Sequence, residues 1–184
     1  QPSFDVEGAV LVTGGTGGLG AVVARCLVVE HGVRHLVLTS RRGPDAPGAC
    51  ELAHGLRALG AEGVRVVACD VSDRDALEGL LGEIVAERPL TAVVHAAGVG
   101  DSALTSALTR TQMDTVLAPK ADAAWYLHEL TRGMDLAAFV MFSSAGGLVL
   151  TAGQGNYAAA NVFLDALAAR RAAEGLPATA MAFG

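Results

Sequence analysis

Apolar residues along the chain gather in short continuous runs that alternate with longer amphipathic stretches. Six runs are apolar almost throughout and show no alternation with polar positions, which is typical of strands covered on both faces of a parallel sheet. These runs are Ala9–Val12, His35–Leu38, Val64–Ala68, Leu90–His95, Ala138–Phe142 and Ala178–Phe183.

Between the apolar runs lie five stretches with the spacing of amphipathic helices, and in the third of them Ser72 or Asp73 is the expected N-cap. The stretches are Leu19–His31, Ala49–Leu59, Asp73–Glu87, Thr109–Arg132 and Asn156–Glu174. Strands that alternate with helices imply right-handed crossovers. The pattern therefore predicts an α/β fold, a Rossmann-type doubly wound parallel sheet of order 3-2-1-4-5-6 with helices on both faces.

Composition narrows the class of protein. The chain has 184 residues, of which 52% are hydrophobic and 17% charged, so it predicts one ordered domain and excludes intrinsic disorder. No apolar run is long enough to cross a bilayer, and no signal peptide is visible. A net charge of −6 argues against nucleic-acid binding. Three cysteines without a CxxC pair argue against disulfides and structural zinc, and suit a cytoplasmic protein.

A glycine-rich segment follows the first predicted strand. Gly15, Gly17 and Gly20 satisfy G-x-G-x-x-G, and the same segment satisfies T-G-x-x-x-G-x-G from Thr13. Glycines let the backbone approach a pyrophosphate, and the following helix N-terminus offers N–H donors. A tight turn without a ligand is the alternative. The candidate cofactor-binding residues here are Gly14, Gly15, Thr16, Gly17, Gly18 and Leu19.

Side chains after the second, third and fourth strands complete the candidate nucleotide site. NAD-binding folds carry an acidic residue after the second strand, whereas this chain has Ser40, Arg41 and Arg42, which suit a 2′-phosphate and favour NADPH. A solvated loop is the alternative for the two arginines. Asp70 before Val71 is a candidate acceptor for the adenine amino group, or else a turn residue. The small residues Ala96, Ala97 and Gly98 would leave room for the cofactor.

A second group of residues has the chemistry of carbonyl reduction. Ser144 ends the fifth strand, and Tyr157 and Asn161 share one face of the last predicted helix. A hydride transferred to a ketone needs a proton donor for the developing alkoxide, which a tyrosine beside an ammonium can supply. Twelve of the thirteen basic residues are arginine, so Lys120 is the only lysine and the candidate ammonium. Packing in a helix is the alternative for Tyr157 taken alone.

On these motifs, together with Lys120 at thirty-seven residues before Tyr157, the chain resembles the short-chain dehydrogenase/reductase superfamily. Within it, the chain resembles the ketoreductase domain of modular type I polyketide synthases. Most short-chain reductases carry Tyr-x-x-x-Lys, and Asn161 at the last position is usual in the ketoreductases. The resemblance implies that Tyr157 donates the proton, Ser144 binds the β-carbonyl, Lys120 binds the nicotinamide ribose, and Asn161 holds Lys120 and a water.

By the same resemblance, the substrate is a β-ketoacyl thioester on an acyl carrier protein, and the other domains of the same synthase are further partners. Residues 1–184 would form the NADPH-binding catalytic core, without the N-terminal structural subdomain and C-terminal lid of complete ketoreductase regions. The markers of product configuration are missing. Ser102 replaces an aspartate of one class and Val149 replaces the tryptophan of the other, so the sequence leaves the configuration open. A free-standing carbonyl reductase and a redox-silent structural module are the alternative functions.

Overall fold

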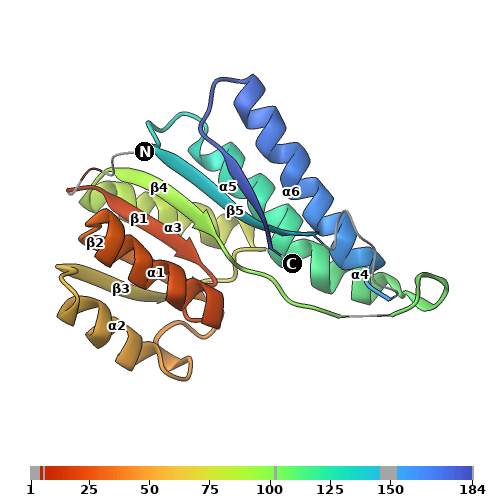
Figure 1. The fold of residues 1–184 in the computed structure, drawn as a ribbon, viewed down its shortest axis with the longest axis horizontal. Helices are drawn as coiled ribbons and strands as arrows, with labels where there is room; N and C mark the ends of the chain where they lie inside the picture. The colour runs from red at the N-terminus through yellow and green to blue at the C-terminus, as the bar shows by residue number, and fades with distance from the viewer. Residues whose placement is uncertain (1–4, 6, 102, 146–152, 184) are drawn as a thin grey trace.

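The computed structural model describes residues 5, 7–101, 103–145 and 153–183. Its centre is one parallel sheet in the order β3-β2-β1-β4-β5-β6 (Figure 1), which confirms the predicted doubly wound topology. The strands are β1 (Ala9–Thr13), β2 (His35–Ser40), β3 (Gly63–Ala68), β4 (Leu90–His95), β5 (Ala138–Ser144) and β6 (Thr179–Phe183). Because the order reverses between β1 and β4, the carboxyl ends of these two strands form the ligand-binding edge expected of such sheets.

The sheet separates two apolar layers, as the continuous apolar runs predict. Alternate strand residues face opposite sides. Leu11 of β1 packs in a cluster with α3 (Arg74–Glu87), α5 (Ala123–Thr131) and α6 (Gly155–Ala173). Val12, the next residue, packs in the cluster that includes α1 (Gly18–His31) and α2 (Ala49–Ala58). Helices therefore lie on both faces, and Asp73, one of the two expected caps, accepts the N–H groups of Asp75 and Ala76 at the start of α3.

The long helix expected over Thr109–Arg132 is interrupted. It consists of α4 (Arg110–Leu117), a π turn (Ala118–Asp122) and α5. Pro119 lies inside the π turn and has no N–H group, so a regular α-helical ladder could not continue through it. The π turn contains Lys120, the candidate ammonium, directly after Pro119.

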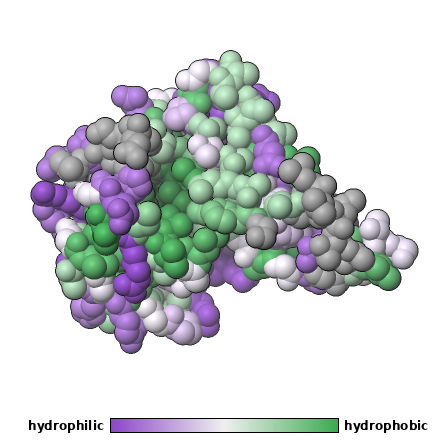
Figure 2. Space-filling model, viewed as in Figure 1, coloured by the Kyte–Doolittle hydropathy of each residue, from purple (hydrophilic) through white to green (hydrophobic). Residues whose placement is uncertain are grey.

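The sixth strand differs from the sequence prediction. Its residues are mostly exposed, whereas an apolar run of this kind predicts cover on both faces. Among the described residues, no helix lies over β5 and β6 on the side of α1 (Figure 1). A groove of about 330 Å³ runs between α1 and this edge, lined mostly by apolar side chains such as Val23, Val140 and Met181. Figure 2 shows the apolar surface in the hollow at the middle of this face.

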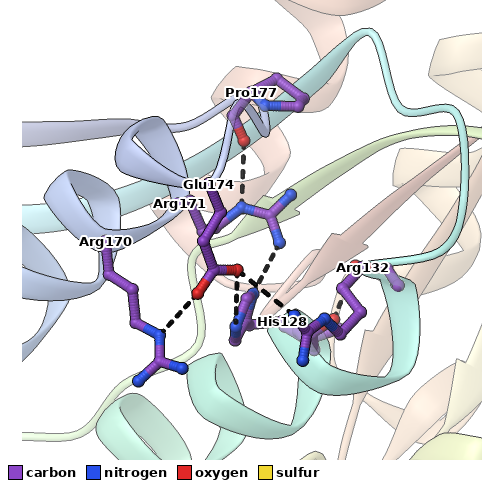
Figure 3. A network of polar contacts seen from close by, with 8 residues as sticks. His128, Arg132, Arg170, Arg171, Glu174 and Pro177 are labelled. Atoms are coloured by element: carbon purple, nitrogen blue, oxygen red, sulfur yellow. Dashed lines mark hydrogen bonds and ion pairs between the residues drawn. The ribbon is translucent and has the colours of Figure 1, made fainter.

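A polar cluster fastens the far end of α6 to α5 (Figure 3). Arg171 is fully buried and donates from Nε to the carbonyl of Pro177 (3.0 Å), and its guanidinium lies 3.9 Å from the ring centroid of Phe139. Arg171 Nη1 is 3.1 Å from Nδ1 of His128. Since a guanidinium only donates, His128 is the acceptor and carries its proton on Nε2, which faces Glu174. Burial, and then the Arg171 charge, lower the pKa of His128, so this imidazole is held neutral.

Candidate active site

Two adjoining cavities open at the carboxyl ends of the strands. The larger, of about 630 Å³, is lined by the glycine loop and by the ends of β2 and β3. The smaller, of about 300 Å³, is lined by Lys120, Ser144 and Tyr157. Both share the segment that follows β4, residues 96–100, as a common wall. The predicted cofactor and reducing groups therefore lie at neighbouring parts of one edge of the sheet.

The glycine loop is shaped by close backbone approaches. Gly14 has a φ of +66°, and a Cβ there would lie 2.7 Å from the carbonyl oxygen of Ala96. A Cβ on Gly20 would collide with the carbonyl oxygen of Gly14, so side chains are excluded at both positions. At Gly18 a Cβ would meet nothing. The first turn of α1 carries no acidic residue and no side-chain cap, so its N–H groups are available to an anion.

These features fit a dinucleotide. A pyrophosphate needs close access to N–H groups at a helix N-terminus, and the loop provides that access. Gly14, Thr16 and Gly17 line the larger cavity, whereas Leu19 lines the smaller. Gly15 packs against Leu38, where a Cβ would come within 2.8 Å of that side chain, and Gly18 lines neither cavity.

The two candidate arginines after β2 differ in their position relative to the larger cavity. Ser40 and Arg41 line the larger cavity, and Arg42 does not. Ser40 Oγ accepts the N–H of Gly43 (3.0 Å), which fixes the turn that follows the strand. Both guanidinium groups belong to exposed residues, and neither forms an ion pair with any residue that the structure describes. Arg41 is thus the better placed of the two to meet a phosphate.

Asp70 lies at the cavity, as an adenine acceptor would, and is also a turn residue. It lines the larger cavity together with Val71, and its Oδ1 accepts the N–H and the hydroxyl of Ser72, at 3.0 and 2.6 Å. The carboxylate therefore closes the turn before α3. Ala96, Ala97 and Gly98 line both cavities, as small residues beside a cofactor should.

Lys120 and Tyr157 meet although they are far apart in the sequence. Nζ of Lys120 lies 4.5 Å from the centroid of the Tyr157 ring, and Lys120 is only 5% exposed. Burial lowers the pKa of the Lys120 ammonium from its usual value, and the neighbouring Tyr157, followed by Asp165, opposes that shift. None of the ion pairs in the described part of the chain includes Lys120, so its buried charge is directed at the phenol.

The two serines at the end of β5 have different surroundings. Ser143 is buried, and its hydroxyl donates to the carbonyl of Asn161 (3.3 Å). Ser144 is half-buried and lines the smaller cavity with Tyr157. Phe183, at the end of β6, stacks on Phe142 and forms the opposite wall while remaining 51% exposed. Ser144 is therefore the serine that a substrate in this cavity can approach.

Asn161 lies one helical turn behind Tyr157 and does not line the cavity. It is fully buried, and its Nδ2 donates to the carbonyl of Tyr157 (2.9 Å). Its Oδ1 is a buried acceptor without a hydrogen-bond partner among the described residues, and buried acceptors normally have one. This fits a role beside an ammonium or a water, and the role itself stays a prediction.

Asn156 of α6, which the sequence analysis did not single out, holds the loop after β4, where Asp101 lines the larger cavity. Asn156 is buried, and its Nδ2 donates to the carbonyls of Asp101 (2.8 Å) and Gln112 (3.2 Å). Its Oδ1 accepts the N–H of Tyr157 (2.9 Å). The loop after β4, the start of α4 and the tyrosine are thereby joined through one amide. The two markers of product configuration, Ser102 and Val149, lie outside the described residues.

His95 is a second residue of this kind, since the sequence analysis gave it only as the end of a predicted strand. It ends β4, is 1% exposed, and contacts Thr13 on one side and Lys120 on the other. Complete burial lowers the pKa of His95 from 6.5 to about 4, so its imidazole is neutral. The signal that could have identified it is a polar residue at the end of a strand that is otherwise apolar.

We expect acid to destabilise the fold through His95. The unfolded chain binds a proton near pH 6.5 and the folded chain only near pH 4, so stability is present above 6.5 and is lost as the pH falls toward 4. The shift corresponds to a loss on the order of 3 kcal/mol. Urea unfolding at neutral pH and near pH 4.5 measures it. A His95→Gln variant should lose less stability on acidification than the parent, and an equal loss would contradict the assignment.

The described residues carry neither a metal cluster nor a membrane-spanning helix. No group of three or more histidine, cysteine or acidic side chains among them could hold a metal ion. None of the helices in the described part of the chain combines the length and apolarity that crossing a membrane requires.

Comparisons with known proteins agree on one family. The model of the KR domain family matches residues 8–184. The chain is 62% identical over 183 residues to polyketide synthase GfsB of Streptomyces halstedii, and 59% identical over 184 residues to mycoketide-CoA synthase of Mycobacterium tuberculosis. These matches take in 100% of the chain, and 3% and 4% of the two synthases.

Solved structures give the same result. A structure titled as A-type ketoreductases from a modular polyketide synthase superposes with a TM-score of 0.92 at 53% identity, over 99% of this chain and 38% of that one. The ketoreductase from the first module of phoslactomycin biosynthesis in Streptomyces sp. HK803 gives 0.92 at 44% identity, over 99% and 42%. The chain thus spans a few per cent of the curated relatives, and about two fifths of these solved ketoreductases.

Proposed function

Because the chain belongs to the KR domain family, whose relatives include ketoreductases of modular polyketide synthases, we propose that it carries out the NADPH-dependent reduction of a β-keto group to a β-hydroxyl. The substrate is an acyl chain held as a thioester on an acyl carrier protein of the same synthase. One observation supports this most directly: the Lys120 ammonium lies 4.5 Å from the Tyr157 ring centroid, beside the cavity of the glycine loop.

The chain's own residues divide the work of the reaction. Tyr157 donates a proton to the carbonyl oxygen, and the Ser144 hydroxyl donates a hydrogen bond to the same oxygen, where negative charge develops. Lys120 stabilises the phenolate that remains on Tyr157, since an ammonium favours the charged form of a neighbouring acid. NADPH supplies the hydride for the carbonyl carbon, so ketone, hydride and proton together give the secondary alcohol.

The nucleotide is held by the groups around the larger cavity. The glycine loop and the first turn of α1 would hold the pyrophosphate, and Asp70 and Val71, which line the same cavity, would hold the adenine. Arg41 and Ser40 bind the 2′-phosphate, which selects NADPH over NADH. Ala96, Ala97 and Gly98 border the path from the loop to Tyr157.

The assay for this function uses the full-length protein with a simple β-ketoacyl thioester or trans-1-decalone. NADPH consumption is followed by absorbance, and the product is identified by chromatography as the β-hydroxy compound or the decalol. Formation of the alcohol with NADPH supports the proposal. NADPH binding without any alcohol would instead identify a redox-silent module.

The cofactor preference is tested by Arg41→Ala. Loss of a guanidinium–phosphate contact costs about 1.5–3 kcal/mol, so we expect the KM for NADPH to rise by roughly 10-fold to 100-fold. The KM for NADH should stay within about 2-fold, since NADH has no 2′-phosphate. Arg42→Ala is the matched control and should have the smaller effect, because Arg42 does not line the cavity. An equal loss for both nucleotides in Arg41→Ala would contradict the role.

A further inference from the structure

A chain of hydrogen bonds connects the start of the cofactor loop to the backbone of Lys120. Thr13 Oγ1 lies 2.7 Å from Nδ1 of His95, and Nε2 of His95 lies 2.9 Å from the carbonyl oxygen of Lys120. The N–H of Ala97 approaches Thr13 Oγ1 at 3.4 Å. Thr13 and His95 are fully buried. Thr13 and His95 therefore belong to the interior of the protein and line neither cavity, whereas Ala97 lines both cavities and Lys120 lines the smaller one.

The direction of these hydrogen bonds follows from their chemistry. The carbonyl of Lys120 can only accept, so Nε2 of His95 carries the proton. Because His95 is neutral, its Nδ1 is bare and accepts the hydroxyl proton of Thr13. The same hydroxyl oxygen can then accept the N–H of Ala97. One imidazole tautomer satisfies every group, and the opposite tautomer would set a bare nitrogen against a carbonyl oxygen.

The contact falls where the helix is irregular. Lys120 lies in the π turn Ala118–Asp122, and the N–H of Ala123 is shared between the carbonyls of Ala118 and Lys120. A π turn holds one residue more than an α turn, and one residue corresponds to about 100° of rotation around the helix axis. If the turn relaxed to α-helical geometry, the Lys120 side chain would point in a different direction from the one it has in the π turn. A fixed donor on the Lys120 carbonyl opposes that change.

We propose that His95 is a positioning residue for carbonyl reduction. The hydrogen bond from its Nε2–H to the Lys120 carbonyl holds the π turn in the conformation that directs the Lys120 ammonium toward Tyr157. Thr13 stabilises the tautomer of His95 that carries this proton on Nε2. The reduction itself rests on the proposed function. The inference adds that the cofactor loop and the lysine are coupled through the buried end of β4. His95 itself lines neither cavity and contacts Lys120, which lines the smaller one, so it acts through Lys120.

Few ionisable groups among the described residues lie near Lys120, so a change in its position should have a measurable effect on its chemistry. The ionisable groups that interact with it are Tyr157 and Asp165 of α6, and the neutral His95 of β4 contacts its carbonyl. A change at His95 that moves Lys120 therefore changes the distance between the ammonium and the phenol. The reaction rate and the chemical reactivity of the lysine should both respond.

The test compares two substitutions in the full-length protein. His95→Gln keeps an amide donor near the position of Nε2, whereas His95→Asn keeps one near Nδ1 and cannot reach the Lys120 carbonyl. We expect His95→Asn to lower kcat by about 10-fold to 100-fold, since small misplacements of a catalytic group have effects of this size. His95→Gln should stay within about 3-fold of the parent, and KM for NADPH should change less than kcat in both.

A double-mutant cycle separates positioning from general damage to the fold. In a Lys120→Met background, His95→Asn should lower the residual rate by less than about 2-fold. The effects of two substitutions are not additive when one residue acts through the other. If His95→Asn lowers the rate equally with and without the lysine, or if the Gln and Asn variants are equally impaired, the proposal is wrong.

A second measurement does not depend on activity. Acetylation of Lys120 by an amine-reactive reagent, followed by peptide mass spectrometry across a pH series, reports the exposure and proton affinity of this ammonium. Thr13→Val, which removes the hydroxyl that fixes the tautomer, should speed labelling at least about 3-fold, and Thr13→Ser should not. Unchanged labelling in Thr13→Val overturns the proposal. If the parent reduces no ketone, the proposed function fails while the labelling still decides the role of His95.

Discussion

Substitution of Tyr157 by phenylalanine is expected to lower kcat for ketone reduction by at least about 100-fold. Among the described residues that line the smaller cavity, the phenol is the one acid beside the buried ammonium, with 4.5 Å between Nζ of Lys120 and the ring centroid. Phenylalanine keeps the ring and removes only the proton donor. The Kd for NADPH, measured by fluorescence titration, should therefore change by less than about 3-fold, so the loss appears in kcat and not in cofactor binding.

The chain offers a matched control for this variant, because it has only two tyrosines. Tyr126 lies on α5 and packs, partly buried, against the apolar layer of that helix. Tyr126→Phe should retain the parent's kcat within about 2-fold. Ser144→Ala should reduce kcat less than Tyr157→Phe does, since it removes a hydrogen bond and leaves the proton donor. Undiminished reduction by Tyr157→Phe would exclude the proposed mechanism.

The fold could be predicted because its sequence signals agree with one another. The six apolar runs mark the strands, and the glycine loop joins the first of them to a helix as a nucleotide-binding fold requires. The exposure of β6 could not be predicted in this way. A local pattern shows that a strand is apolar, whereas its burial depends on which helices lie over it, and no described helix covers β6 on the side of α1.

The sequence likewise predicted the residue types of the site but not all of its geometry. Lys120 is the only lysine and the family resemblance implies its pairing with Tyr157, whereas their proximity is a property of the fold. The π turn was not predicted, because Pro119 within an amphipathic stretch indicates a break without specifying its geometry. His95 was passed over for a different reason. Its function depends on Thr13 and on the Lys120 carbonyl, which are eighty-two and twenty-five residues away in the sequence.

Lys120→Met is expected to separate activity from stability. Kcat should fall by roughly 100-fold, because the phenolate of Tyr157 loses its stabilising charge. The folded state should become more stable by about 1 kcal/mol, since a buried charge without a carboxylate in an ion pair is replaced by an apolar side chain of similar length. Urea unfolding at neutral pH measures the stability, and Lys120→Arg, which retains a charge, should show no such gain.

The pH dependence of this gain provides a stricter test. Burial lowers the pKa of Lys120 below 10.5 in the folded chain, so the folded parent releases its proton at a lower pH than the unfolded parent does. Between the two values the unfolded chain binds more protons, and the stability of the parent rises with pH. The advantage of Lys120→Met should therefore shrink as the pH approaches 10.5. If the variant is instead less stable than the parent at neutral pH, the interaction of the ammonium with Tyr157 outweighs its burial, and Lys120 holds the site together as well as serving the reaction.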